Sequence, residues 1–373
     1  MTSPAVWLDR QSSMVRGSMI AVAVFLASRF AVLVAIFVIH TFDGSKQLMS
    51  ILTNWDGAWY LRVAEHGYPT SVPEGVGNAA QSTLPFFPGY PLLVKGVAVI
   101  PGLSLEHAAV LAALASGTAA AILVWHLAAR YYDEATATRT VALLSFFPSA
   151  YVLSMTYAEG LFIALAAGCL LALRSERWVV AGLCAAWAGA TRLPGVALAL
   201  ACVWVAAMAV RQRGDRKALV AAVIAPLGTV SWLAYLRVHT GSWSAFTDAQ
   251  RRGWANEGVT GLARQLEAIF SGDLFRNLSV WQGGVGLAIL VVATVVFLRQ
   301  RPDPVLIVYV AGAVVPTAAA GLFAPRYIMV AIPLLMAIAS RVKGGAFDAL
   351  IGVSAVVMTM LFVTVSITSA TVP

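Results

Sequence analysis

The stretch of this 373-residue chain that is richest in reactive side chains reads NWDGAWY over residues 54–60 and continues as EHGYP over 65–69. It places Asp56 between Trp55 and Trp59, with a glycine next to the acid. A carboxylate held against aromatic rings is partly desolvated, which suits a general base. The two indoles can stack on a sugar ring, or they can anchor the loop at lipid-headgroup depth. Asp56 is therefore a candidate general base, and an aromatic belt with an incidental aspartate is the alternative.

Two arginines lie at turns between apolar runs, Arg192 in the sequence TRLP and Arg326 in the sequence APRY. A charge next to hydrocarbon is costly, so an arginine at such a turn invites a functional explanation. The planar guanidinium is well suited to clamping a phosphate. Snorkelling to lipid headgroups, or an internal ion pair with Asp56 or Glu159, would explain the same residues.

Four more polar positions fit two interpretations each. Glu159 begins an apolar run, where it can cap a helix through the dipole or supply a second acid to the site. Gln250 and Trp254 are one helical turn apart, which suits a sugar ring and its hydroxyls but equally an interfacial helix. Arg29, about halfway along the first apolar run, is expected to be a buried partner for an acid or a backbone carbonyl.

The elements that must position these residues are membrane helices. The chain is 60% hydrophobic and only 11% charged, whereas a soluble domain has about 25% charged residues. Apolar runs recur from end to end, and together they predict an all-α polytopic protein that forms one membrane domain over 1–373 with roughly eleven crossings. The expected spans are 17–40, 106–129, 138–153, 157–173, 177–191, 194–210, 218–237, 281–299, 304–322, 327–340 and 347–368.

The distribution of Lys and Arg predicts the orientation, because cytoplasmic connections carry their excess. Alternate connections are basic, which places the N-terminus in the cytoplasm and the C-terminus outside. Two long connections, 41–105 and 239–280, then share the outer face. This orientation requires that 84–101, which has three prolines before a short apolar stretch with a central Lys95, lies along the outer interface instead of crossing.

Several other classes of function are disfavoured. The cytoplasmic connections contain no glycine pattern of a nucleotide-binding loop. The net charge of +8 follows from basic residues between apolar runs, so nucleic acid is not an expected partner. The three cysteines lie inside apolar runs, and no residues have zinc-ligand spacing. We expect no cofactor and no protein-bound metal, although a single Asp neither requires nor excludes a divalent ion.

Several motifs together resemble one known family, the PIG-V-like mannosyltransferases of the GT-C superfamily. The resemblance covers roughly residues 18–340 and rests on motifs that occur in the family's order. They are WDGAWYLRVAEHGYP, FFPGYPLL, FPSAYVLSMTYAEGLF, ATRLPG, the AQ…GW pair and PRY. The first motif is the specific one, and it departs from the eukaryotic pattern at Trp59, where that pattern tends to carry His or a similar residue.

The resemblance implies a GT-C-like fold whose first outer loop carries interfacial helices. It also implies a multi-pass plasma-membrane enzyme that moves mannose from a polyprenyl-phosphate donor to a glycolipid or lipoglycan acceptor on the extracytoplasmic face. Asp56 would be the catalytic base, and Arg192 and Arg326 would bind the donor phosphate. The remaining candidates for binding the sugar or the acceptor are Trp55, Trp59, Tyr60, His66, Tyr157, Glu159, Gln250, Trp254 and Tyr327.

Two functions outside this class remain open from the sequence. A transporter or lipid flippase would explain the proline-interrupted segments FFP at 86–88 and 146–148. Transporter sites usually lie at mid-membrane, whereas the ionisable residues here gather at the predicted outer boundary. A scaffold or assembly protein is the third possibility, and it would not need the carboxylate of Asp56.

Overall fold

The computed structural model describes residues 4–254, 260–271 and 278–367, and within these ranges the chain is helical with no β-strand. The predicted all-α fold is confirmed. The helices of the first half are α1 (Pro4–Phe42), α2 (Leu48–Leu52), α3 (Asp56–His66), η1 (Gly77–Ala80), α4 (Gly89–Val97), α5 (Leu105–Tyr131), α6 (Glu134–Ser145), η2 (Ala150–Leu153), α7 (Glu159–Arg174) and α8 (Trp178–Thr191). Those of the second half are α9 (Gly195–Arg213), η3 (Arg216–Ala218), α10 (Leu219–Ile224), α11 (Leu227–Thr240), α12 (Ala245–Trp254), α13 (Thr260–Phe270), α14 (Leu278–Arg299), α15 (Pro304–Ala319), α16 (Pro325–Met329), α17 (Ile332–Arg341) and α18 (Gly344–Ile367).

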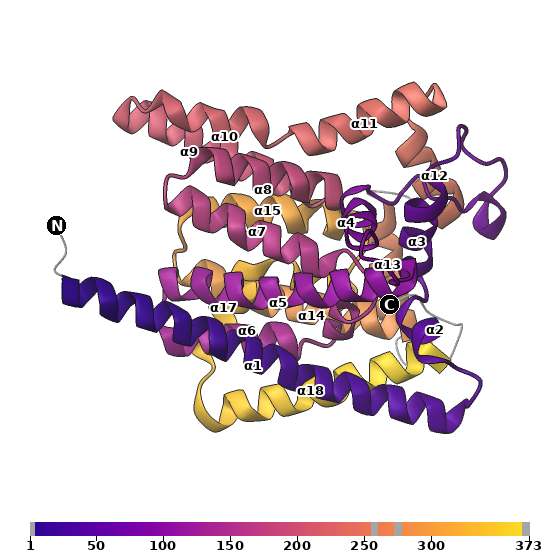
Figure 1. The fold of residues 1–373 in the computed structure, drawn as a ribbon, viewed down its shortest axis with the longest axis horizontal. Coiled ribbons are helices and arrows are strands. Elements are labelled where there is room, and N and C mark those ends of the chain that lie inside the picture. Colours follow the sequence, from indigo (N-terminus) through magenta and orange to yellow (C-terminus); the bar gives the residue numbers. More distant parts are fainter. Residues whose placement is uncertain (1–3, 255–259, 272–277, 368–373) are drawn as a thin grey trace.

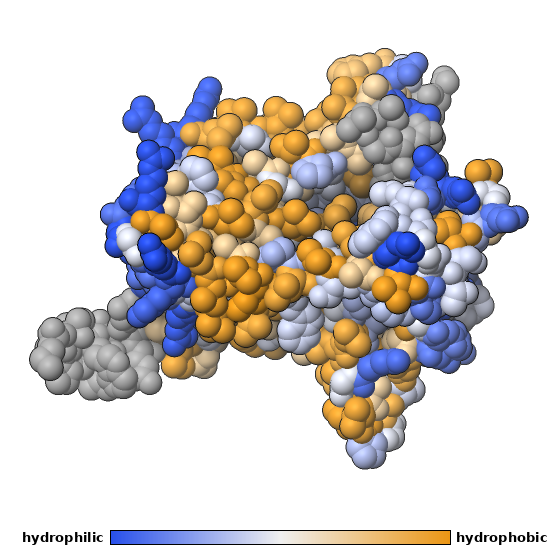
Figure 2. Space-filling model, turned by 90° about the horizontal axis from the view of Figure 1, so that it is seen from above, coloured by the Kyte–Doolittle hydropathy of each residue, from blue (hydrophilic) through white to orange (hydrophobic). Residues whose placement is uncertain are grey.

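The long helices lie side by side, and the short helices α2, α3, α4, α12 and α13 gather at one end of the bundle, on the right of Figure 1. We call this the loop-rich end. At the opposite end, α7, α9, α14 and α17 each finish on an arginine, and we call it the basic end. Figure 2 shows an apolar band between hydrophilic rims at the two ends.

The apolar band fits a bilayer. Among the described residues, 6 helices are long and apolar enough to cross a membrane, and three shorter apolar helices lie between them. The chain is thus a multi-pass membrane protein. The number of crossings stays a prediction from the apolar runs, and the orientation of the termini stays a prediction from the charge pattern.

Local sequence explains where several helices begin and end. Ser104 caps α5 and Asp133 caps α6, each accepting a hydrogen bond from a backbone N–H two or three residues into the helix. Asp303 caps α15 in the same way. Gly214 adopts the left-handed conformation that ends α9, which costs glycine little because it has no Cβ.

Two predicted spans are wrong as continuous helices, and a third, 218–237, lies within the candidate membrane span Arg216–Thr240 but is interrupted once; proline explains each break. The span 138–153 ends as α6 at Ser145, shortly before Pro148, and continues as the separate turn η2. The span 218–237 is divided at Pro226, and 327–340 is divided just before Pro333. Proline has no N–H to donate to the preceding turn, and its ring clashes with that turn.

The segment 84–101 contains one helix, α4, of only nine residues. A helix of about 20 residues is needed to cross the hydrocarbon, so α4 is too short to do so. It packs against α3 and α5 at the loop-rich end, which agrees with the expected interfacial position. Of the predicted second loop, 255–259 and 272–277 lie outside the described residues.

Arg29, in the middle of α1, holds the connection between α6 and α7. Its guanidinium is buried and donates to the carbonyl oxygens of Ser145 and Ala150, both at 2.9 Å, and to Ser154 Oγ at 2.7 Å. The expected pairing with backbone carbonyls is therefore present. The bond to Ser145 satisfies a carbonyl that the end of α6 leaves without a helical partner, and the bond to Ala150 reaches the start of η2. They fix the path of the chain into α7.

We expect Arg29→Met to lower the thermal unfolding temperature of the detergent-purified protein. The variant leaves buried carbonyls without donors, and each unsatisfied group costs about 1–3 kcal/mol. The exposed Arg211 of α9 provides the matched control, and Arg211→Met should unfold at the wild-type temperature. Equal unfolding temperatures for all three proteins would show that Arg29 does not hold this connection.

Candidate active site

A strained turn places Asp56 at the start of α3. Trp55, the residue before the helix, has a positive φ of 58°, a conformation that costs a non-glycine residue about 1–3 kcal/mol. Two hydrogen bonds hold it there. Its backbone N–H donates to Asn54 Oδ1 at 2.8 Å, and its indole N–H donates to the carbonyl of Val365 at 3.3 Å. Trp55 thus has a structural contact, and the turn directs the next side chain toward the bundle.

Asp56 forms an ion pair with Arg326 at the loop-rich end. Nη1 of Arg326 lies 2.6 Å from Oδ2 of Asp56, and the two side chains are 8% and 19% exposed. Tyr157 accepts a hydrogen bond from the Asp56 N–H at 3.3 Å. Tyr327 accepts one from Nη2 of Arg326 at 2.8 Å, and its ring lies against the same guanidinium. Four predicted site residues are thereby brought together.

Arg326 also retains a donor with no partner. Its Nε is buried and makes no hydrogen bond among the described residues. Because buried donors are nearly always satisfied in folded proteins, each exception needs an explanation. An anionic ligand at this position would supply the missing acceptor.

Glu159 and Arg192 form a second close ion pair, and the Glu159 side chain is only 1% exposed. Glu159 is also the first residue of α7, where the helix dipole favours a negative charge. The cap interpretation and the site interpretation of Glu159 are therefore compatible. The internal ion pairs considered from the sequence both form, so neither Arg192 nor Arg326 is an uncompensated charge.

Tyr60 connects the two ion pairs. Its phenol lies within electrostatic range of Asp56, Glu159, Arg192 and Arg326. Burial raises the pKa of Tyr60 well above its ordinary value, with smaller contributions from these four charges. The hydroxyl therefore stays protonated at physiological pH and can donate a hydrogen bond.

An aromatic wall lies beside these charges. Trp59 stacks on Phe86 with ring centroids 5.8 Å apart, and Trp254 meets both rings edge-on at 5.5 and 5.7 Å. Arg62 covers the Trp59 ring at 4.5 Å. Phe86 also contacts Tyr60 at 5.2 Å, which makes the wall continuous with the charged residues. The indole N–H of Trp254 is buried and has no hydrogen-bond partner among the described residues.

Two predicted site residues lie apart from this arrangement. His66, the last residue of α3, has a side chain that is 72% exposed and lies 3.4 Å from Glu65. Gln250 is half-buried on α12, one turn before Trp254, and makes no hydrogen bond to either ion pair in the described chain. Both remain candidates for contact with an acceptor, but neither takes part in the charged centre.

Phe86 and Arg62 belong to the aromatic wall but were not predicted as site residues from the sequence. Phe86 belongs to the FFPGYPLL motif, but its contact with Trp59 depends on the packing of α3 against α4. Arg62 is three residues after Trp59 on the same helix face, and this spacing predicts their contact. Within the described ranges, no three His, Cys, Asp or Glu side chains lie together as a protein metal site would require.

Gly57 allows α3 to approach the segment before α7. A Cβ at this position would overlap Oγ1 of the buried Thr156, whose N–H donates to the carbonyl of Leu52 at 2.9 Å.

We expect Gly57→Ala to destabilise the protein by about 1–3 kcal/mol through overpacking. Thr156→Ala removes the obstructing oxygen, so the double variant should unfold at a higher temperature than Gly57→Ala alone. Thermal unfolding measures both, and an unaltered Gly57→Ala protein would contradict the close approach.

Comparison with known proteins supports the architecture. No family model and no curated protein matches the chain. Among solved structures, the Archaeoglobus fulgidus oligosaccharyltransferase in its apo form is 16% identical with a TM-score of 0.50, over 93% of this chain and 56% of that one. The same protein in complex with Zn and sulfate is 19% identical with a TM-score of 0.46, over 84% and 48% of the two chains.

A third solved structure is ArnT from Cupriavidus metallidurans bound to undecaprenyl phosphate. It is 16% identical with a TM-score of 0.48, over 88% of this chain and 62% of that one. The chain thus spans about half to three fifths of the length of the structures that it matches. The likeness to the archaeal oligosaccharyltransferase shows that this chain shares the fold of that protein.

Proposed function

We propose that this protein is an inverting glycosyltransferase that moves a sugar, specifically mannose, from a polyprenyl-phosphate donor to a lipid-linked glycan or glycolipid. The reaction takes place on the extracytoplasmic face of the plasma membrane, where the charge pattern puts the loop-rich end. The observation that carries the proposal is the contact between the partly exposed carboxylate of Asp56 and the guanidinium of Arg326. An acceptor-activating base and a phosphate-binding cation are the two groups that such a transfer needs.

The reaction needs no strong acid, because the leaving group is a phosphate that is stable as an anion. Asp56 removes the proton from the acceptor hydroxyl, and that oxygen attacks the anomeric carbon of the donor sugar. The bond from this carbon to the phosphate oxygen breaks, and the phosphate keeps the electron pair. Arg326 and Arg192 stabilise the negative charge that develops on the departing phosphate. A single displacement inverts the anomeric configuration.

A donor phosphate that binds Arg326 competes with Asp56 for the same guanidinium, and the unpartnered Nε offers it an additional donor. When Asp56 loses part of its contact with Arg326, the carboxylate is free to accept the proton of an acceptor hydroxyl. In this scheme, binding of the donor activates the base, so the acceptor is deprotonated only when the phosphate is in place.

The aromatic wall supports a carbohydrate substrate. Trp59 and Trp254 offer faces and edges against which the apolar side of a sugar packs, while the free indole N–H of Trp254 can donate to a hydroxyl. The assignment of mannose and of a glycolipid acceptor rests on the motifs shared with PIG-V-like mannosyltransferases. Both ion pairs lie at one end of the bundle, which favours this assignment over transport through mid-membrane.

Asp56→Asn should abolish transfer while leaving the fold intact. Loss of a general base typically lowers the rate by about 10²–10⁴-fold. The measurement is sugar transfer from purified polyprenyl-phosphate-mannose to a membrane lipid extract. Glu65→Gln, an exposed acid on the same helix, is the matched control and should turn over like wild type. Equal turnover by Asp56→Asn would remove Asp56 from the mechanism.

Arg326→Gln should act mainly on the donor. The variant removes the cation that binds the phosphate, so we expect donor affinity to fall by at least tenfold, the usual consequence of losing a charge-assisted hydrogen bond. Titration of the donor into the purified variant gives the affinity directly. Arg326→Lys keeps the charge but not the planar pair of donors, and it should fall between wild type and Arg326→Gln. Wild-type affinity in both variants would place the phosphate elsewhere.

A further inference from the structure

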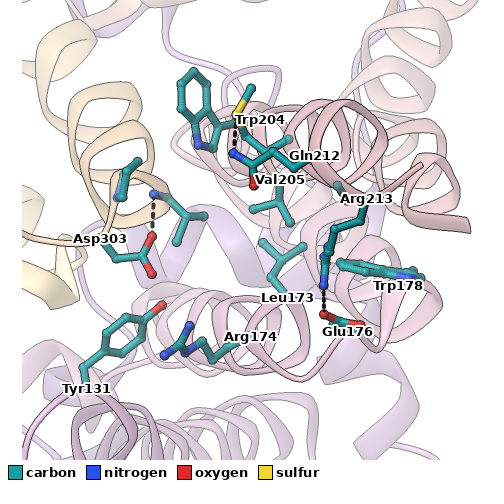
Figure 3. Close-up of a pocket in the computed structure, with 14 residues that line it drawn as sticks. Tyr131, Leu173, Arg174, Glu176, Trp178, Trp204, Val205, Gln212, Arg213 and Asp303 are labelled. Atoms are coloured by element: carbon teal, nitrogen blue, oxygen red, sulfur yellow. Dashed lines mark hydrogen bonds and ion pairs between the residues drawn. The ribbon is translucent and has the colours of Figure 1, made fainter. Parts of the chain in front are cut away.

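A cavity lies at the basic end, remote from Asp56. It has a volume of about 360 Å³ and lies where the ends of α5, α7 and α9 meet the beginnings of α8 and α15 (Figure 3). This size falls within the range of roughly 300–1,000 Å³ that is typical of ligand sites. None of the residues proposed above for sugar transfer lines it.

One side of the cavity carries a cation that has no carboxylate partner. The guanidinium of Arg174, at the end of α7, lies 5.6 Å from the ring centre of Tyr131 and forms no ion pair within the described chain. The hydroxyl of Tyr131 is buried and has no hydrogen-bond partner there either. Figure 3 shows the two polar groups next to each other on the cavity wall. An unpaired guanidinium beside an unsatisfied hydroxyl is a suitable setting for a phosphate.

The same cavity also presents acids. Asp303 caps α15 through one carboxylate oxygen, which accepts from the N–H of Val305 at 3.1 Å. Glu176 forms an ion pair with Arg213 at the edge of the cavity, where both side chains are about half exposed. Two cations and two carboxylates therefore line the cavity, and its net charge is zero. A ligand that carries only negative charge would match half of this lining.

The remaining wall is apolar and reaches the outside of the bundle. Trp204, Met208 and Pro304 contribute to it, and the ring of Trp204 is partly exposed on the surface of α9. Tryptophan at the boundary of the apolar band is typical of residues at headgroup depth. The cavity therefore joins a polar pocket to a surface that faces hydrocarbon chains.

We propose that this cavity binds the headgroup of a zwitterionic phospholipid of the phosphoethanolamine class. The lipid phosphate binds Arg174 and accepts a hydrogen bond from the Tyr131 hydroxyl. The ammonium lies on the acidic side, next to Asp303 and Glu176, and the acyl chains pass over Trp204. The site lies at the membrane interface opposite the proposed catalytic centre, so it does not depend on sugar transfer.

Binding can be measured by native mass spectrometry on the detergent-purified full chain with dihexanoyl phosphatidylethanolamine. Dihexanoyl phosphatidylglycerol carries the phosphate without the ammonium, and glycerophosphoethanolamine carries both without acyl chains. We expect the ethanolamine lipid to bind at least about tenfold more tightly than either probe. Equal or tighter binding of phosphatidylglycerol would overturn the assignment of the ammonium. Equal binding of the chain-free probe would show a site for a soluble phosphate ester instead of a lipid.

Variants test the residues of the site. Arg174→Gln should weaken binding of the ethanolamine lipid by about tenfold or more, and Tyr131→Phe should weaken it less. The nearby Arg177 is exposed and does not line the cavity, so Arg177→Gln should bind like wild type. Wild-type affinity in both Arg174→Gln and Tyr131→Phe would overturn the site. Sugar transfer should be retained in Arg174→Gln and Tyr131→Phe. A loss of lipid binding with retained transfer would show that the lipid site and the proposed catalytic centre are independent.

Discussion

The ion pair between Asp56 and Arg326 is the contact on which the loop-rich end depends. It joins residues that are 270 positions apart. It thereby connects α3, which follows the first long helix, to α16, which lies near the end of the chain. The residues around it give it a fixed geometry. The strained turn at Trp55 directs the carboxylate, Gly57 lets α3 come close to Thr156, and Tyr327 holds the guanidinium.

A second ion pair lies at the same end, and each pair is neutral on its own. Burying an unpaired charge is very costly, whereas a pair that is also hydrogen-bonded is tolerated. The loop-rich end contains Asp56 with Arg326 and Glu159 with Arg192, which together carry no net charge. A phosphate that enters this centre changes the balance. In our proposal that change separates Asp56 from Arg326 and frees the carboxylate to accept a proton.

Much of this arrangement could be predicted from the sequence, because it depends on local patterns. Hydrophobic runs predicted the membrane helices, and the WDG motif identified Asp56. Spans that cross Pro226 or approach Pro148 were predicted as continuous, because the apolar signal persists through residues that break a helix. Ion pairs between distant segments, such as Arg326 with Asp56, could be given only as one of several alternatives, because the sequence does not show which segments lie side by side. Contacts such as Trp59 with Phe86 depend on how α3 packs against α4, which no local pattern specifies.

Reversing the ion pair tests the central claim most directly. Asp56→Arg and Arg326→Asp should each lower the unfolding temperature, and the double variant should recover most of the loss because opposite charges face each other again. Sugar transfer should stay undetectable in the double variant, since the carboxylate no longer projects from α3. Transfer at the wild-type rate by the swapped protein would contradict the account, because the pair would then serve only to hold the helices together.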